Sequence, residues 1–206
     1  MLKADKGKII DGKITVKIQP NLEHGALVAV HALVMHQTGG STAASALEKY
    51  KTKGADGAHF LIDKDGTIYQ TAHVNKSTFH VGKLQSRCTN LKSCSPDDAT
   101  AIQTIMHPKT KKKEKVPYSK KVKQLHEHEM KKDYPKRYPS NDDSLGIEVV
   151  GKPVKGIYED PTDKQAESVK WLVAGLLDLF NLTTEDVYRH PDVSYKDATE
   201  AKSVTW

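Results

Sequence analysis

Runs of apolar residues predict two buried strands in this chain. The stretch ALVAVHALVMH (residues 26–36) is apolar almost throughout, which is typical of a central strand covered on both faces, and SLGIEVVG (residues 144–151) predicts a second one. Alternating patterns predict two hairpins as well. GKIIDGKITVKI would turn at Asp11-Gly12, and AHFLIDKDGTIYQTA would turn at Asp65-Gly66.

In other parts of the chain the apolar residues recur with the period of a helix. PTDKQAESVKWLVAGLLDLF is the strongest helix, because Thr162 and Gln165 have the spacing of a capping box ahead of an apolar face. That face consists of Ala166, Val169, Leu172, Val173, Leu176, Leu177 and Phe180. A shorter helix is expected from a cap at Ser41 or Thr42 to about Lys53.

This order of elements predicts an α/β fold, with a mixed central β-sheet flanked by helices in a single domain spanning residues 1–206. Residues at about 84–143 interrupt the pattern with lysine runs, prolines and both cysteines of the chain. We therefore expect a long basic insertion there, in which KKVKQLHEHEMKK forms a short exposed helix.

The positive charge of the chain is concentrated in that segment. The formal net charge is +6, but residues 107–137 hold twelve Lys or Arg against four acids, so the rest of the chain is slightly acidic. One solvated lysine-rich segment thus explains the basic balance. Without aromatic residues at regular spacing or a known reader motif, a nucleic-acid partner is not expected.

The beginning of the chain, MLKADKGK, lacks the apolar region of a secretory signal, and the longest apolar stretch is too short to cross a bilayer. We expect a soluble protein that is synthesised in the cytoplasm without a signal peptide and has no membrane span. Cys88 and Cys94 could form a disulfide in an oxidising compartment or stay free thiols in a reducing one, and the sequence leaves both open.

Several titratable residues stand where chemistry is expected. His36 ends a predicted buried strand, and the glycines after it open space beside the imidazole. Taken alone, such a histidine is more often simply satisfied at a strand end, and His190 and Glu200 are equally ambiguous. Glu148 is the only charge in LGIEVVG, and an acid among apolar strand residues needs a partner or a function.

Considered together, five segments change this interpretation. VMHQTGG, GAHFLIDKDGTIYQ, STFHVGK, SLGIEVVG and RHPDVSYKDATEA resemble, in this order, the zinc-dependent N-acetylmuramoyl-L-alanine amidase family, whose fold is shared with peptidoglycan recognition proteins. The resemblance covers most of residues 34–200 outside the insertion. An ordered match of five segments is far more specific than any single histidine.

The resemblance implies a site with Zn²⁺ as its cofactor. His36 and His190 would be zinc ligands, and Glu200 would be the third, since a carboxylate lies ten residues after His190. Asp197 is the rival for the third position. Glu148 corresponds to the catalytic acid of the family, which moves protons during hydrolysis.

The remaining expected site residues depart from the family pattern. Lys196 resembles the lysine that stabilises an oxyanion in some members, although its offset differs. Ala58 stands where a tyrosine is often found, which makes His59 a second candidate for the polar catalytic group. His80 and Phe79 match a Trp-His-x-Gly motif and are expected to contact substrate.

The function that the resemblance implies is hydrolysis of the amide bond between N-acetylmuramic acid and L-alanine in bacterial peptidoglycan. The alternative is a non-catalytic peptidoglycan-binding module of the same fold. The resemblance is compatible with a phage lysin, a recycling enzyme or a type VI secretion effector acting on periplasmic peptidoglycan. The insertion and the cysteines favour the effector, whose partners would include an immunity protein and the secretion apparatus.

Overall fold

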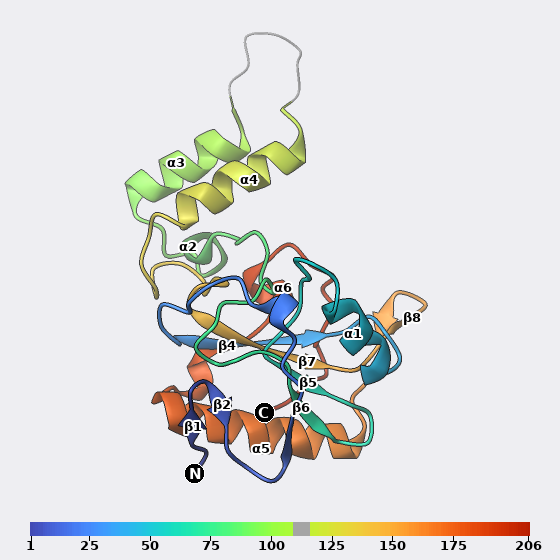
Figure 1. The fold of residues 1–206 in the computed structure, drawn as a ribbon. Coiled ribbons are helices and arrows are strands. Elements are labelled where there is room, and N and C mark those ends of the chain that lie inside the picture. The colour runs from blue at the N-terminus through green and yellow to red at the C-terminus, as the bar shows by residue number, and fades with distance from the viewer. Residues whose placement is uncertain (109–115) are drawn as a thin grey trace.

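The computed structural model describes residues 1–108 and 116–206 and has a six-stranded mixed sheet at its centre (Figure 1). The strands lie in the order β10-β4-β7-β5-β6-β3. Their bounds are Ile14–Val16 (β3), Ala32–Gln37 (β4), Phe60–Ile62 (β5), Ile68–Gln70 (β6), Ser144–Val149 (β7) and Val187–Arg189 (β10). All neighbouring pairs are parallel except the β5–β6 hairpin.

Helices cover both faces of this sheet, which confirms the predicted α/β architecture. The long helix α5 (Asp163–Phe180) lies along one face, and α1 (Ala43–Tyr50) and α6 (His190–Val193) lie on the other (Figure 1). The smaller elements are the pairs β1 (Ala4–Asp5) with β2 (Lys8–Ile9) and β8 (Pro153–Val154) with β9 (Ile157–Tyr158), and the 3-10 helices η1 (Pro20–Leu22) and η2 (Thr184–Asp186).

Strand β4 occupies the central position that its apolar sequence predicts. It pairs with β10 on one side and with β7 on the other, and all of its residues are buried. Because side chains alternate along a strand, Leu33 and Met35 face the core beneath α5, while Val34 belongs to a separate cluster on the opposite face. By the same alternation, the side chain of His36 projects from the same face as that of Val34, near the carboxyl end of the strand.

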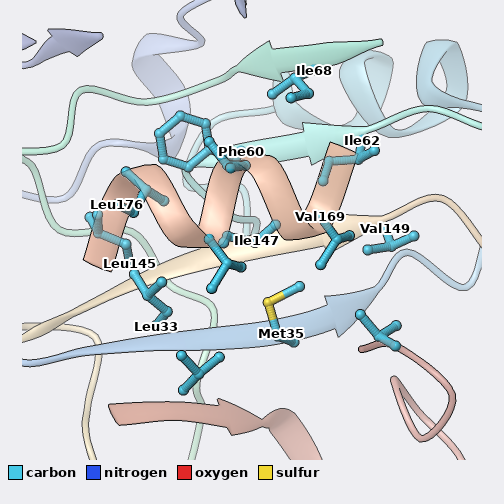
Figure 2. Close-up of a cluster of buried hydrophobic side chains, with 14 of the residues drawn as sticks. Leu33, Met35, Phe60, Ile62, Ile68, Leu145, Ile147, Val149, Val169 and Leu176 are labelled. Carbon is cyan, nitrogen blue, oxygen red and sulfur yellow. The ribbon is translucent and has the colours of Figure 1, made fainter. Parts of the chain in front are cut away.

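Helix α5 holds the main core together. Thr162 and Gln165 form the predicted capping box at its start. Figure 2 shows Val169 and Leu176 of α5 lying over Leu145 and Ile147 of β7, among other side chains of the sheet. The sheet is thereby closed on this face mainly by apolar contacts, and the buried side chain of Gln165 adds hydrogen bonds to the carbonyls of Ile62 and Val150.

One predicted hairpin is confirmed and the other is wrong. β5 and β6 pair across Asp65-Gly66 as expected. At Asp11-Gly12 a turn does form, with Asp11 accepting a bond from the Lys13 amide, but the strands that it joins belong to different sheets. The amide of Ile9 instead donates to the side chain of Gln70, and β3 pairs in parallel with β6.

Three helices occupy the stretch that was expected to be an insertion. They are α2 (Arg87–Asn90), α3 (Pro96–Met106) and α4 (Tyr118–Glu129), and α3 and α4 stand apart from the sheet as an antiparallel pair (Figure 1). Cys88 and Cys94 form a disulfide at the base of this pair. The predicted helix is α4, although it buries Val122 and Leu125 instead of lying fully exposed.

The lysine run of residues 109–115 lies outside the described residues. Among the helices that the structure describes, none combines the length and the apolarity required to cross a bilayer.

We predict that Leu172→Ala, in the middle of α5, lowers the free energy of unfolding by about 2–5 kcal/mol, because it leaves a cavity in a side chain site with no solvent exposure. Urea denaturation followed by circular dichroism measures this loss. The matched control is Lys170→Ala on the exposed face of the same helix, which should change stability by less than about 0.5 kcal/mol. Equal losses in both variants would contradict the assigned core.

Candidate metal and catalytic centre

Three buried side chains meet at the carboxyl end of β4. The Nδ1 atoms of His36 and His190 lie 2.8 Å apart, and Oε1 of Glu200 lies 2.9 Å from His190 Nδ1 and 3.6 Å from His36 Nδ1. Among the described residues this is the one group of His, Cys, Asp or Glu side chains whose ligand atoms converge in this way. The structure therefore brings together the three residues expected to hold a metal.

Hydrogen bonds between two side chains and the backbone of the next residue hold Glu200 in place. Gln37, next to His36 on β4, accepts a hydrogen bond from the amide of Ala201, which directly follows Glu200. The guanidinium of Arg189, next to His190, donates to the carbonyl of Ala201. Gln37, beside His36, and Arg189, beside His190, are thus both hydrogen-bonded to Ala201, beside Glu200.

A hydrogen bond fixes the tautomer of His190. Its Nε2 lies 2.9 Å from the carbonyl oxygen of Val81. Because a carbonyl can only accept, Nε2 must carry the hydrogen, and Nδ1 of the neutral ring is then a lone pair. That lone pair faces Glu200.

A relay through His80 fixes the tautomer of His36. His80 Nε2 lies 3.3 Å from the hydroxyl and 3.4 Å from the carbonyl of Ser144, and that hydroxyl already donates to Ser140. His80 therefore donates from Nε2 and accepts at Nδ1, which lies 3.1 Å from Nε2 of His36. Gly146 makes room for the relay, since a Cβ there would lie 2.8 Å from His80 Nδ1.

Together these bonds leave three electron-pair donors facing one another with no hydrogen assigned between them. Burial, followed by the charge of His190, lowers the pKa of His36 to about 4. Burial would raise the pKa of Glu200, but when the two imidazoles are protonated their hydrogen bonds and charges outweigh burial and lower that pKa to about 2, so the carboxylate is ionised before the rings lose their protons. Two neutral imidazoles and an ionised carboxylate are the ligand forms that a divalent metal requires, so the group fits a metal ion.

Glu148 faces the same side of the sheet. It is paired with His36 in the register of β7 against β4, and residues paired in this way project from the same face. The hydroxyl of Tyr50 donates to its Oε2 at 2.7 Å. Burial is the main reason that the pKa of Glu148 is raised, and the hydrogen bond from Tyr50 partly offsets it. A cavity of about 190 Å³ lies beside Glu148 and is lined in part by α1.

Lys196 and Asp197, which lie between His190 and Glu200, are both exposed. The pKa of His36 is lowered chiefly by burial, and the charge of Lys196 adds to this in the same direction. Asp197 instead accepts hydrogen bonds from the amide and hydroxyl of Thr199 at 2.8 Å and 2.7 Å. It is not part of the converging group, which contains Glu200.

His59 and Phe79 lie away from the converging group. Both nitrogens of the buried His59 are bonded to backbone, Nε2 to the carbonyl of Lys76 at 2.8 Å and Nδ1 to the amide of Gly146 at 3.0 Å. This gives His59 a bracing role in the sheet, and its catalytic role stays a prediction. Phe79 is 44% exposed and stacks on His24, with ring centroids 3.6 Å apart.

Sequence reasoning missed two tyrosines at the centre, Tyr50 and Tyr158. Tyr158 lies on β9, and its phenol pKa is raised by burial and then by the charges of Glu200, Asp197 and Glu148. The glycine in KPVKGIY could have predicted the β8–β9 turn that carries it. Tyr50 gave no signal, because its position on α1 reads as an ordinary apolar site.

The residues just before α2 are hydrogen-bonded to the segment that carries His190. The side-chain amide of Gln85 donates to the carbonyls of Pro191 and Ser194 at 2.9 Å and 2.7 Å, and the Gln85 backbone amide donates to Val193. We call this contact between residues 81–86 and 190–194 the seam. It includes the Val81 carbonyl that holds His190.

Comparisons with known proteins identify the family and the fold of the chain. The family model described as N-acetylmuramoyl-L-alanine amidase matches residues 27–203. The crystal structure of a selenomethionine derivative of AmpD is similar over 98% of this chain and 94% of its own, with a TM-score of 0.57 and 16% identity. PlyL gives a TM-score of 0.51 at 12% identity over 89% of this chain and 84% of its own.

The catalytic domain of XlyA gives a TM-score of 0.50 at 17% identity, covering 89% of this chain and 87% of its own. At these identities the solved structures show a shared fold. No curated protein sequence matches the chain.

The buried histidines predict that acid destabilises the protein. Burial lowers the pKa of His59 to about 4, from 6.5 for an exposed histidine. As pH falls below 6.5, the unfolded chain binds a proton that the folded protein refuses until about pH 4, so folding stability is lost across this window. For His59 alone the loss at pH 5 relative to pH 7 is about 2 kcal/mol.

Urea denaturation at both pH values, in the presence of a chelator, measures this loss. In His59→Gln the difference between pH 7 and pH 5 should shrink, whereas His107→Gln at an exposed position should leave it unchanged. A wild-type stability that is flat between the two pH values would show that these histidines are not buried as neutral rings.

Proposed function

The chain belongs to the N-acetylmuramoyl-L-alanine amidase family, and on that premise we propose that it is a zinc-dependent enzyme that hydrolyses the amide bond between N-acetylmuramic acid and L-alanine in peptidoglycan. The observation that carries the proposal is the convergence of His36, His190 and Glu200 on one buried point. Glu148 on the adjacent strand supplies the acid and base that amide hydrolysis needs.

The donor set supports zinc among the divalent metals. Zinc prefers imidazole nitrogen and carboxylate oxygen, and its catalytic sites use three protein ligands. His36 Nδ1, His190 Nδ1 and Glu200 Oε1 make up such a set. When bound, zinc supplies a Lewis acid and lowers the pKa of water. His80 and the Val81 carbonyl would keep the two imidazoles in the tautomers that ligation requires.

Glu148 is the proposed proton carrier. Its pKa is raised by burial, which suits a group that must both accept and release a proton. It would accept a proton from the attacking water as the new C–O bond forms. It would then deliver that proton to the nitrogen of L-alanine as the C–N bond breaks. Lys196, four residues before Glu200 on the segment that follows His190, is the proposed donor to the oxygen of the tetrahedral intermediate.

Phe79 is the proposed contact for the glycan or the peptide. Its ring is partly exposed and already stacked on His24, so the pair offers an aromatic surface for an apolar face of the substrate. His80 was expected to contact substrate as well, but its bonds to His36 and Ser144 favour the orienting role. A non-catalytic binding module would not need the complete set of ligands together with Glu148.

The Cys88–Cys94 disulfide supports action in an oxidising compartment such as the periplasm. Delivery there as a type VI secretion effector, with an immunity protein and a secretion apparatus as partners, remains part of this proposal. Purified peptidoglycan incubated with the protein tests the function directly. Mass analysis should find released peptides that begin with a free L-alanine amine, and a chelator should stop their release.

We predict one zinc ion per chain, with Glu200 as a direct ligand. Glu200→Ala should weaken zinc binding by more than about 100-fold, because residues that only orient a ligand typically cost about 10- to 100-fold. Asp197→Ala is the matched control and should change affinity by less than about 3-fold, since Asp197 is exposed and bonded to Thr199. Titration against a competing chelator measures both, and a larger loss in the Asp197 variant would reverse the assignment.

We also predict that Glu148→Gln keeps zinc but loses about 10²- to 10⁴-fold in turnover, since an amide cannot carry the proton. Glu48→Gln, on the exposed side of α1, is the control and should retain full activity. Rates on purified peptidoglycan and metal analysis of the same samples decide the outcome. Activity within a few fold of wild type would remove Glu148 from the mechanism, and loss of zinc would make it a ligand.

A further inference from the structure

We infer that Tyr50 is a positioning residue for Glu148, which fixes one oxygen of the catalytic carboxylate so that the other is presented to substrate. The inference rests on the proposed function and deepens it. Tyr50 is the last residue of α1 and is 3% exposed. Its hydroxyl donates to Glu148 Oε2 at 2.7 Å, across 98 residues of sequence.

The surroundings of Tyr50 hold its ring in one place. A Cβ on Gly57 would lie 2.4 Å from Tyr50 Cε1 and 2.9 Å from Leu22 Cδ2, so only glycine permits this packing. Tyr50 shares a buried cluster with other residues of α1, with Leu22 of η1 and with Leu61 of β5. A rigid ring fixed by close packing sets the position of its hydroxyl, and a buried hydroxyl needs a partner.

The hydroxyl restricts the carboxylate in turn. With Oε2 bonded to Tyr50, the terminal torsion of Glu148 is no longer free to rotate. The described residues provide no hydrogen bond to Oε1, which leaves that oxygen to accept and deliver the proton. Room for a reacting group exists next to this pair, because Tyr50 and Glu148 both line the cavity of about 190 Å³.

The phenol is suited to a constant donor role. Burial and then the charge of Glu148 raise the pKa of Tyr50 well above its ordinary value, so the hydroxyl is protonated at neutral pH. Glu148 therefore meets a donor at Oε2. The bond would favour the ionised carboxylate, the form that accepts a proton from water.

Tyr50→Phe tests this role because it removes the hydroxyl and keeps the packed ring. On a soluble N-acetylmuramoyl-peptide, kcat should fall about 10- to 100-fold, as expected for loss of a hydrogen bond to a charged group, while KM stays within about twofold. In a Glu148→Gln background the same change should lower the residual rate by less than about threefold, because the carboxylate that it orients is already gone.

Tyr134→Phe is the matched control. Its hydroxyl also donates to a carboxylate, that of Asp186, at 2.7 Å, but outside the catalytic centre. It should leave kcat unchanged. Zinc content and thermal unfolding of each variant establish that the fold is retained. Should Tyr50→Phe fail to fold, 3-fluorotyrosine at position 50, which changes donor strength and little else, should alter kcat, and at position 134 it should not.

The outcomes separate this inference from the function on which it rests. If wild-type protein releases no peptide from peptidoglycan, the proposed function fails. If wild type is active but Tyr50→Phe retains full kcat, acts through KM alone, or lowers the Glu148→Gln rate as much as it lowers the wild-type rate, the function stands and the positioning role is overturned. An unchanged kcat with 3-fluorotyrosine at position 50 overturns it too.

Discussion

The structure depends on holding three mutually repelling electron pairs together. Nδ1 of His36, Nδ1 of His190 and Oε1 of Glu200 lie 2.8–3.6 Å apart in a buried site, where water cannot separate them. Such an arrangement persists only if other hydrogen bonds hold each group in its position. The fold does this by giving every imidazole a partner for its second nitrogen and by bonding Ala201, beside the carboxylate, to β4 and β10.

The division of the sheet into two faces makes this possible. On one face α5 closes a largely apolar core, with buried Gln165 donating to the carbonyls of Ile62 and Val150. The other face can then hold a histidine and a glutamate on adjacent central strands, where parallel pairing keeps His36 and Glu148 level with each other. Because both strands are buried in the middle of the sheet, their backbones are the most rigid scaffold that the chain offers.

Local patterns in the sequence predicted much of this fold. Period and capping identified β4, β7, the β5–β6 hairpin and α5, since each depends on neighbouring residues. The first hairpin was predicted wrongly because Gln70, far along the chain, takes the amide of Ile9. The likeness to a family indicated the converging side chains, but not the groups behind them. No local pattern distinguishes a histidine that reaches a substrate from His80, which braces another histidine, or marks Tyr50 as a partner of Glu148.

The seam between residues 81–86 and 190–194 also joins the paired helices to the catalytic segment. The hydrogen bonds of the seam continue into α4, because the amide of Leu84 donates to Nδ1 of His126 at 3.2 Å, and the Cys88–Cys94 disulfide closes the chain just beyond Gln85. The paired helices α3 and α4 extend outward from that closed base (Figure 1). Because Tyr118 of α4 also meets the ring of Tyr195, between His190 and Glu200, an ancestral chain could not have exchanged these helices without touching the catalytic segment, so specialisation for a new target and preservation of the reaction are linked.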